Sequence, residues 1–130
     1  MLYGLGSDRR KRIRVVPGKQ DPIVININGE NFIEIVYASD VSESGIGIVV
    51  PYGFEGCRLD KDVSIVVTLP IPEKRSLLFS GKIRHIRNTN FGIHLNGIEK
   101  EKRLMLRNYV SSQLTNRPWY IKFLFRMGII

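Results

Sequence analysis

Two short stretches of this 130-residue chain combine residue types that can bind an anion. In the first, a cationic run, Arg10 and Arg14 stand four residues apart. Each guanidinium presents five N–H donors in a planar fork, which suits a phosphate or the O6/N7 edge of guanine. Taken alone, such a run is more typical of a solvated basic tail or of a contact with nucleic acid. The cations of the run are Arg9, Arg10, Lys11, Arg12 and Arg14.

The second stretch is a polar turn, residues 40–45, between two apolar runs. Asp40 and Ser42 carry side chains that can fold a turn by bonding to nearby backbone groups. Gly45 has no Cβ, which suits a sharp turn or the close approach of a ligand. A carboxylate, a hydroxyl and a bare backbone also suit the donor-rich N1/N2 edge of guanine. The two roles are compatible, because a folded turn can hold ligand-binding groups in place.

Short apolar runs separated by turn residues surround both stretches. The alternation of Ile23, Ile25 and Ile27 with polar positions predicts a half-buried strand over 22–28. Asn28-Gly29 predicts a hairpin that leads into a second strand over 31–38. Further strands are expected over 46–50, 62–69, 77–87 and 91–95, with Gly47 marking a bulge or a close backbone approach. This spacing predicts an all-β core, either a small antiparallel barrel or a sandwich.

The hydrophobic period changes to that of a helix over 99–114. Leu106, Tyr109, Val110, Gln113 and Leu114 share one face, so we expect this helix to pack on the sheet. Residues 117–130 are nearly all apolar, with Lys122 and Arg126 four apart. They are interpreted either as a cover for an open barrel edge or as a contact with a second copy or a partner, and less readily as a membrane anchor.

Composition limits the class of protein. The length suits one domain, and a net charge of +8 indicates an anionic partner. Cys57 is the single cysteine, so no internal disulfide can form, which fits a reducing compartment. One cysteine and two histidines predict no metal cluster, and we expect His85 and His94 to be structural. No signal peptide or membrane-spanning run is recognised, and we therefore expect a cytoplasmic protein without stable membrane insertion.

The chain contains the motif Arg10-x-x-x-Arg14 and, after an expected hairpin, the motif Asp40-x-Ser42-x-x-Gly45. The order of these two motifs, their separation and the strands expected between them resemble the PilZ domain family of bacterial cyclic di-GMP receptors. The resemblance covers roughly residues 8–114. It implies a β-barrel rather than a sandwich, with a flexible basic N-terminal arm (1–20) and a barrel with its C-terminal helix (21–114). The apolar extension (115–130) lies outside the resemblance.

The resemblance also implies the roles of the site residues. Arg10 and Arg14 would contact phosphate and the guanine Hoogsteen edge. Asp40 and Ser42 would contact guanine or hold the arginines, and Gly45 would shape the turn. Arg9, just before the motif, can stack on a guanine face and is compatible with a bound pair of ligands.

The predicted function is therefore a cyclic di-GMP receptor or adaptor with no resident cofactor, whose arm orders on binding and presents a surface to a downstream protein. No catalytic motif is found, so no enzyme is expected. The alternative is a small basic barrel that binds RNA or single-stranded DNA, although Phe32, Tyr37, Phe79 and Phe91 form no obvious stacking row. A third interpretation, a related interaction module without ligand binding, is disfavoured by the complete motif pair. Residues 117–130 are the expected surface of any homodimer.

Overall fold

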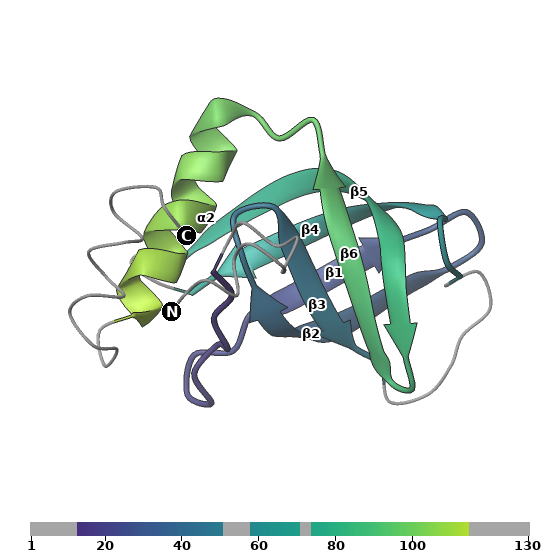
Figure 1. Ribbon diagram of the computed structural model, residues 1–130, viewed down its shortest axis with the longest axis horizontal. Coiled ribbons are helices and arrows are strands. Elements are labelled where there is room, and N and C mark those ends of the chain that lie inside the picture. Colours follow the sequence, from purple (N-terminus) through teal and green to yellow (C-terminus); the bar gives the residue numbers. More distant parts are fainter. Residues whose placement is uncertain (1–12, 51–57, 71–73, 115–130) are drawn as a thin grey trace, which may run out of the picture.

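A computed structural model describes residues 13–50, 58–70 and 74–114 of the chain. Six antiparallel strands close into a barrel in the order β1-β2-β3-β6-β5-β4, and β4 pairs with β1 to complete the ring (Figure 1). This confirms the predicted barrel and excludes the sandwich. The strands are β1 (Val24–Asn28), β2 (Ile33–Val41), β3 (Gly45–Val49), β4 (Asp62–Leu69), β5 (Arg75–Arg87) and β6 (Asn90–Asn96).

The barrel interior is filled by β-branched and other apolar side chains from alternate positions of each strand. Ile25 and Ile27 of β1 are fully buried, as is Ile65 of β4, which pairs with Ile27. Burial of one such side chain contributes roughly 1.5–3 kcal/mol. The alternation that predicted β1 therefore also identifies the face of the strand that lines the core.

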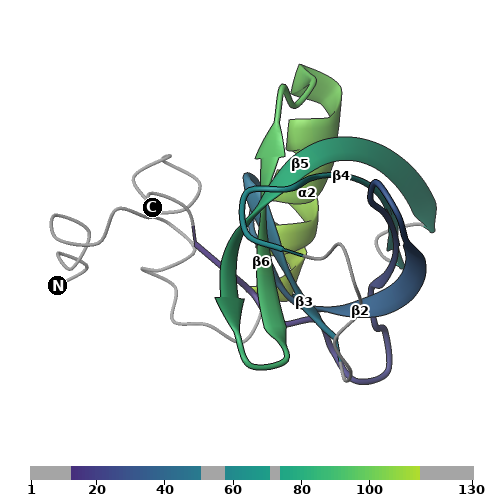
Figure 2. The same ribbon diagram turned by 90° about the vertical axis from the view of Figure 1, so that its right-hand side faces the viewer.

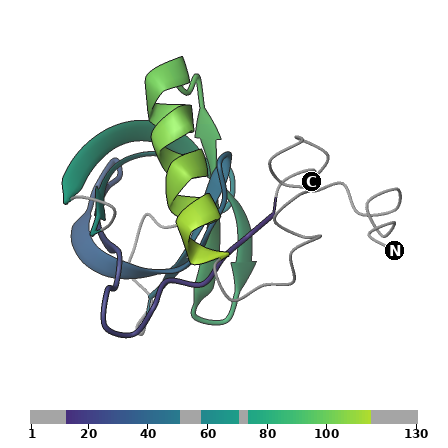
Figure 3. The ribbon, with the colours of Figure 1, turned by 90° about the vertical axis from the view of Figure 1, so that its left-hand side faces the viewer.

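The helix α2 (Lys100–Gln113) lies across one open end of the barrel (Figure 3), and the opposite end is seen in Figure 2. Its buried side chains Leu106, Tyr109 and Val110 belong to the same core cluster as the strands, and Leu114 follows them. The predicted packing face is confirmed apart from Gln113, which is only partly buried. The Arg107 guanidinium lies 2.8 Å from a carboxylate oxygen of the buried Glu43 and joins the helix to the β2–β3 turn.

One element differs from its predicted bounds in a way that affects the site. The β2 strand continues to Val41, so Asp40 lies on the strand and the turn is confined to residues 42–44. The expected six-residue turn is wrong because Asp40 pairs with Gly47 across the ladder, after a register shift between Ala38 and Asp40. A shift of this kind, a β-bulge, re-aims the side chains beside it.

Two predicted segments lie outside the described residues: the cationic run up to Arg12 and the apolar extension over 115–130. Within the described part of the chain, none of the helices has the length and apolar character needed to cross a bilayer.

Candidate functional site

Arg14 is held against the barrel by the residue that follows it. Val15 pairs with Val41 through two backbone hydrogen bonds of 2.9 Å, and Val15 is itself buried in the core. This fixes Arg14 beside the end of β2, where its Nη1 lies 2.6 Å from Oδ1 of Asp40. Both side chains stay partly exposed, at 27% and 35%. The second arginine of the motif and the first residue of the turn motif are therefore in direct contact.

Ser42 organises the turn between β2 and β3. Its Oγ accepts hydrogen bonds from the backbone N–H groups of Ser44 and Gly45 at 3.3 and 3.0 Å, and it lies 3.2 Å from the Gly45 carbonyl oxygen. The residue is only 1% exposed. Its hydroxyl is thus engaged within the turn, and the geometry supports a role in holding the neighbouring groups rather than in touching a ligand.

Two glycines allow polar side chains to approach the backbone near Asp40. A Cβ on Gly45 would lie 3.3 Å from Nη2 of Arg14 and 3.1 Å from the Ile93 carbonyl oxygen. A Cβ on Gly47 would lie 2.8 Å from the Asp40 carboxylate and 2.7 Å from Oγ of Ser39. The close backbone approach predicted at Gly47 is therefore present, and it gives the Asp40 side chain its position.

A cleft of about 700 Å³ runs from Asp40 across the outer side of β3 and β6 to the end of β5. Gly47 of β3 pairs with Gly92 of β6 in register, so the floor of the cleft is backbone without side chains. A Cβ on Gly92 would lie 2.9 Å from Cδ2 of His85, whose imidazole flanks that floor. The lining residues are Arg14, Ser39, Asp40, Gly47, Leu59, Arg84, His85, Ile86, Arg87, Asn90, Phe91 and Gly92.

Three arginines and one carboxylate set the charge of this cleft. Arg14 is paired with Asp40, whereas Arg84 makes a longer contact, of 3.4 Å, with the exposed Asp60. Arg87 is exposed at the end of β5. The positive excess favours an anion, and guanidinium forks favour phosphate oxygens or the acceptor edge of guanine. A flat backbone floor beside imidazole and guanidinium planes also admits a planar ring.

The structure brings together Arg14, Asp40, Ser42 and Gly45 of the predicted site, while Arg9 and Arg10 lie outside the described residues. Sequence reasoning missed Arg84, Arg87, His85 and Gly92. A glycine within a strand was the available signal for Gly92, but its partner on β3 depends on the strand order. Among the described residues, no three His, Cys, Asp or Glu side chains gather in a way that could hold a metal ion.

Comparisons with known proteins identify the family and the fold of this chain. The PilZ domain family model matches residues 8–112. A comparison with curated protein sequences finds no match. Among solved structures, the inhibitor of motility MotI (DgrA) of Bacillus subtilis is similar with a TM-score of 0.72 and 17% identity, over 85% of this chain and 53% of that one. This chain therefore spans about half the length of MotI.

Two structures of YcgR from Escherichia coli show the same fold. Its PilZ domain with c-di-GMP has a TM-score of 0.69 and 12% identity, over 84% of this chain and 94% of that one. The longer YcgR structure in complex with c-di-GMP has a TM-score of 0.59 and 18% identity, over 81% of this chain and 46% of that one. At these identities the likeness establishes the shared barrel fold.

Proposed function

Because this chain belongs to the PilZ domain family, we propose that it is a receptor for cyclic di-GMP that binds in the cleft over β3 and β6. The observation that carries the proposal is the contact between Arg14 and Asp40 at the rim of a cationic cleft with a glycine floor. Similar structures that contain c-di-GMP, such as the PilZ domain of YcgR, support the choice of ligand. A cleft of about 700 Å³ lies within the size range of small-ligand sites.

Each side chain has a role that follows from its position. Arg14 would donate to a phosphate or to the O6/N7 edge of a guanine, with Asp40 fixing the plane of its guanidinium. The free carboxylate oxygen of Asp40 could accept from the guanine N1 and N2 donors. Arg10 would complete the pair of guanidinium groups on the arm, and Arg9 would stack on a second guanine where a pair of ligands binds.

The arm gives the receptor a means of signalling. Val15 is tied to Val41, so the arm has a fixed base next to the cleft. Residues 9–12 are all cationic and repel one another until an anion neutralises them. Ligand binding would then fold the arm over the cleft and create a new surface for a downstream protein, an order–disorder switch. Trypsin cleaves after these cations, so saturating cyclic di-GMP should protect the arm from cleavage. Equal cleavage with and without bound ligand would eliminate this switch while leaving the receptor assignment intact.

Calorimetric titration with cyclic di-GMP tests the binding site. A hydrogen bond to a charged group contributes roughly 1.5–3 kcal/mol, so Arg10→Ala and Arg14→Ala should each weaken affinity by about one to two decades. Arg87→Ala, at the far end of the cleft, should weaken it as well. Lys100→Ala is the matched control, because it removes one exposed positive charge from α2, outside the cleft. No heat of binding for the wild type would refute the proposal, and equal losses for Lys100→Ala would reduce it to a general charge effect.

A nucleic-acid function has less support in this structure. Phe79 and Phe91 are buried in the barrel, so within the described residues these strand aromatics offer no exposed stacking row beside the basic cleft. A single-stranded polyanion would show a log affinity that falls with log salt at about −0.7 per contacted phosphate. A compact dinucleotide should show a shallower dependence.

A further inference from the structure

Three of the four outward positions at the centre of β3 and β6 are glycine, and the fourth is His94. Gly47 pairs with Gly92, and two residues along the strands Gly45 pairs with His94. Ile93, which stands between Gly92 and His94, is buried in the core, so its two neighbours point outwards. The glycine floor of the cleft therefore continues past Gly45 to the exposed imidazole of His94.

Arg14 stands over the glycine that faces His94. Its Nη2 lies 3.3 Å from the position of a Cβ on Gly45. The Ser44 carbonyl accepts the Leu95 N–H at 3.0 Å, so the residues between them are a non-hydrogen-bonded pair, the kind whose side chains lie closer together. Opposite Cβ positions in such pairs are about 4.5–5.5 Å apart, which puts the His94 Cβ within roughly 9 Å of the Arg14 guanidinium. An anion such as phosphate, hydrogen-bonded on both sides, can fill that gap.

Lys82 of β5 follows His94 in the same row of the sheet. Its ammonium lies 3.6 Å from the Asp62 carboxylate, and the two side chains are 36% and 81% exposed. An exposed ion pair of this length contributes little to stability, so the ammonium can exchange Asp62 for another anion at small cost. Its flexible four-carbon stem lets it reach over the neighbouring strand. Lys82 and His94 therefore offer a cation and an N–H donor on the side of Gly45 opposite Arg14.

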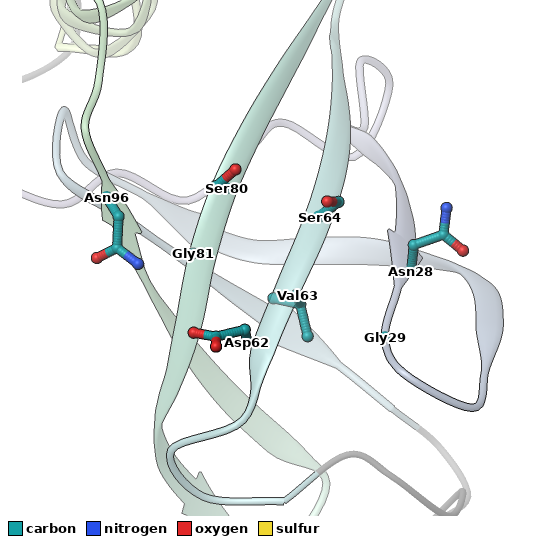
Figure 4. A pocket seen from close by; sticks show the side chains of 8 residues that line it. All are labelled: Asn28, Gly29, Asp62, Val63, Ser64, Ser80, Gly81 and Asn96. Atoms are coloured by element: carbon teal, nitrogen blue, oxygen red, sulfur yellow. The ribbon is translucent and has the colours of Figure 1, made fainter.

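The next row of the sheet carries no charge. Figure 4 shows this row, where Asn96 of β6, Ser80 of β5 and Ser64 of β4 follow one another. Asp62, which the same view labels, belongs to the row of Lys82. An anion at this end of the glycine floor therefore finds no second cation beyond Lys82 in the row formed by these three side chains.

The position of Arg14 between the cleft and His94 indicates which part of the ligand lies there. Its Nη1 bonds to Asp40 beside the cleft, whereas its Nη2 lies over Gly45. A cyclic dinucleotide carries its two phosphates between its two guanosines, so a guanine in the cleft brings a phosphate next to Arg14. Neighbouring strands are about 4.8 Å apart, so Lys82 stands about 10 Å from Gly45, two strands away. A phosphate over Gly45 therefore has Arg14 on one side and His94 and Lys82 on the other.

We propose that Lys82 and His94 bind a phosphate of cyclic di-GMP over Gly45, opposite Arg14. The inference rests on the proposed function and deepens it by naming a second side of the same site. Lys82 supplies a compact point charge, which proteins often use for phosphate, and Arg14 supplies the planar fork. His94 donates a ring N–H to the same group. The contact adds affinity for the phosphate and leaves recognition of guanine to the cleft.

Calorimetric titration with cyclic di-GMP tests each contact. Lys82→Ala and His94→Ala should each lower affinity about tenfold, the smallest loss expected for one hydrogen bond to a charged group. Lys82→Arg and His94→Gln keep an N–H donor and should stay within about threefold of the wild type. Lys61→Ala is the matched control, because Lys61 also lies 3.6 Å from a carboxylate, that of Glu30, and its side chain is 46% exposed. Its affinity should change by less than about twofold.

A double variant shows whether both sides hold one phosphate. If Arg14 and Lys82 bind the same group, the loss in Arg14→Ala/Lys82→Ala should be smaller than the product of the single losses, by at least about threefold. Losses that multiply overturn the inference, as do losses for Lys82→Ala and His94→Ala no larger than that for Lys61→Ala. Normal binding by the wild type in those cases would leave the receptor assignment intact. No heat of binding for the wild type would refute the proposed function and this inference with it.

Discussion

Replacing Tyr109 with phenylalanine should stabilise the protein, because the Tyr109 hydroxyl is buried without a hydrogen-bond partner. The residue is 0% exposed, and its oxygen has no partner in the described structure. A buried polar group left unsatisfied costs roughly 1–3 kcal/mol of desolvation free energy. Tyr109→Phe removes that group and keeps the ring, so the free energy of unfolding at neutral pH should rise by about 1 kcal/mol once lost contacts of the oxygen are allowed for.

The same hydroxyl makes stability depend on pH in the alkaline range. Burial, and secondly the negative charge of Asp21, raises the pKa of Tyr109 from 10.0 to about 12. The folded protein therefore holds this proton more tightly than the unfolded chain does. This group therefore leaves the free energy of unfolding unchanged below pH 10 and lowers it as the pH rises from 10 towards 12. A rise of this size corresponds to roughly 3 kcal/mol of lost stability once the pH has passed the folded-state pKa.

Urea unfolding of the wild type and Tyr109→Phe across this pH range measures both effects. The variant should lack this part of the alkaline fall in stability, so the difference between the two proteins should widen above pH 10. Tyr37→Phe is the matched control, because Tyr37 is 59% exposed and its removal should change neither quantity. A loss of more than about 1 kcal/mol at neutral pH in Tyr109→Phe would mean that the hydroxyl is satisfied, and would refute the reasoning.

Three further predictions concern the site and its support. Gly47→Ala places a Cβ 2.8 Å from the Asp40 carboxylate and should lower cyclic di-GMP affinity at least about tenfold by calorimetry, whereas Gly18→Ala, where a Cβ meets nothing within 4 Å, should not. Glu43→Gln weakens the contact to Arg107 and should lower the free energy of unfolding, measured by urea titration, by about 2 kcal/mol. A decrease below about 0.5 kcal/mol would show that the pair contributes little to stability. The log affinity for cyclic di-GMP should fall less steeply with log salt concentration than the log affinity for single-stranded RNA. Tight RNA binding with a steep salt dependence, and without competition by cyclic di-GMP, would favour the nucleic-acid alternative.

Local pattern was enough to predict most elements of the fold. The alternation of Ile23, Ile25 and Ile27 identified the buried face of β1, and the bounds of β4 agree with the predicted 62–69. These features depend on side-chain period, which the sequence displays directly. The predicted turn at Asp40 was wrong at its start, because the ladder with β3 extends β2 beyond the point where local turn chemistry ends it.

The composition of the site depended on pairings between distant parts of the chain. Arg14 and Asp40 are 26 residues apart and could be linked before the structure only through a family resemblance. Gly47 and Gly92 form one floor because β3 pairs with β6, and neither strand records that pairing locally. His85 was expected to be structural, and a strand position alone gave no sign that its imidazole flanks a cleft. Strand order and register therefore carry the information that local reading lacks.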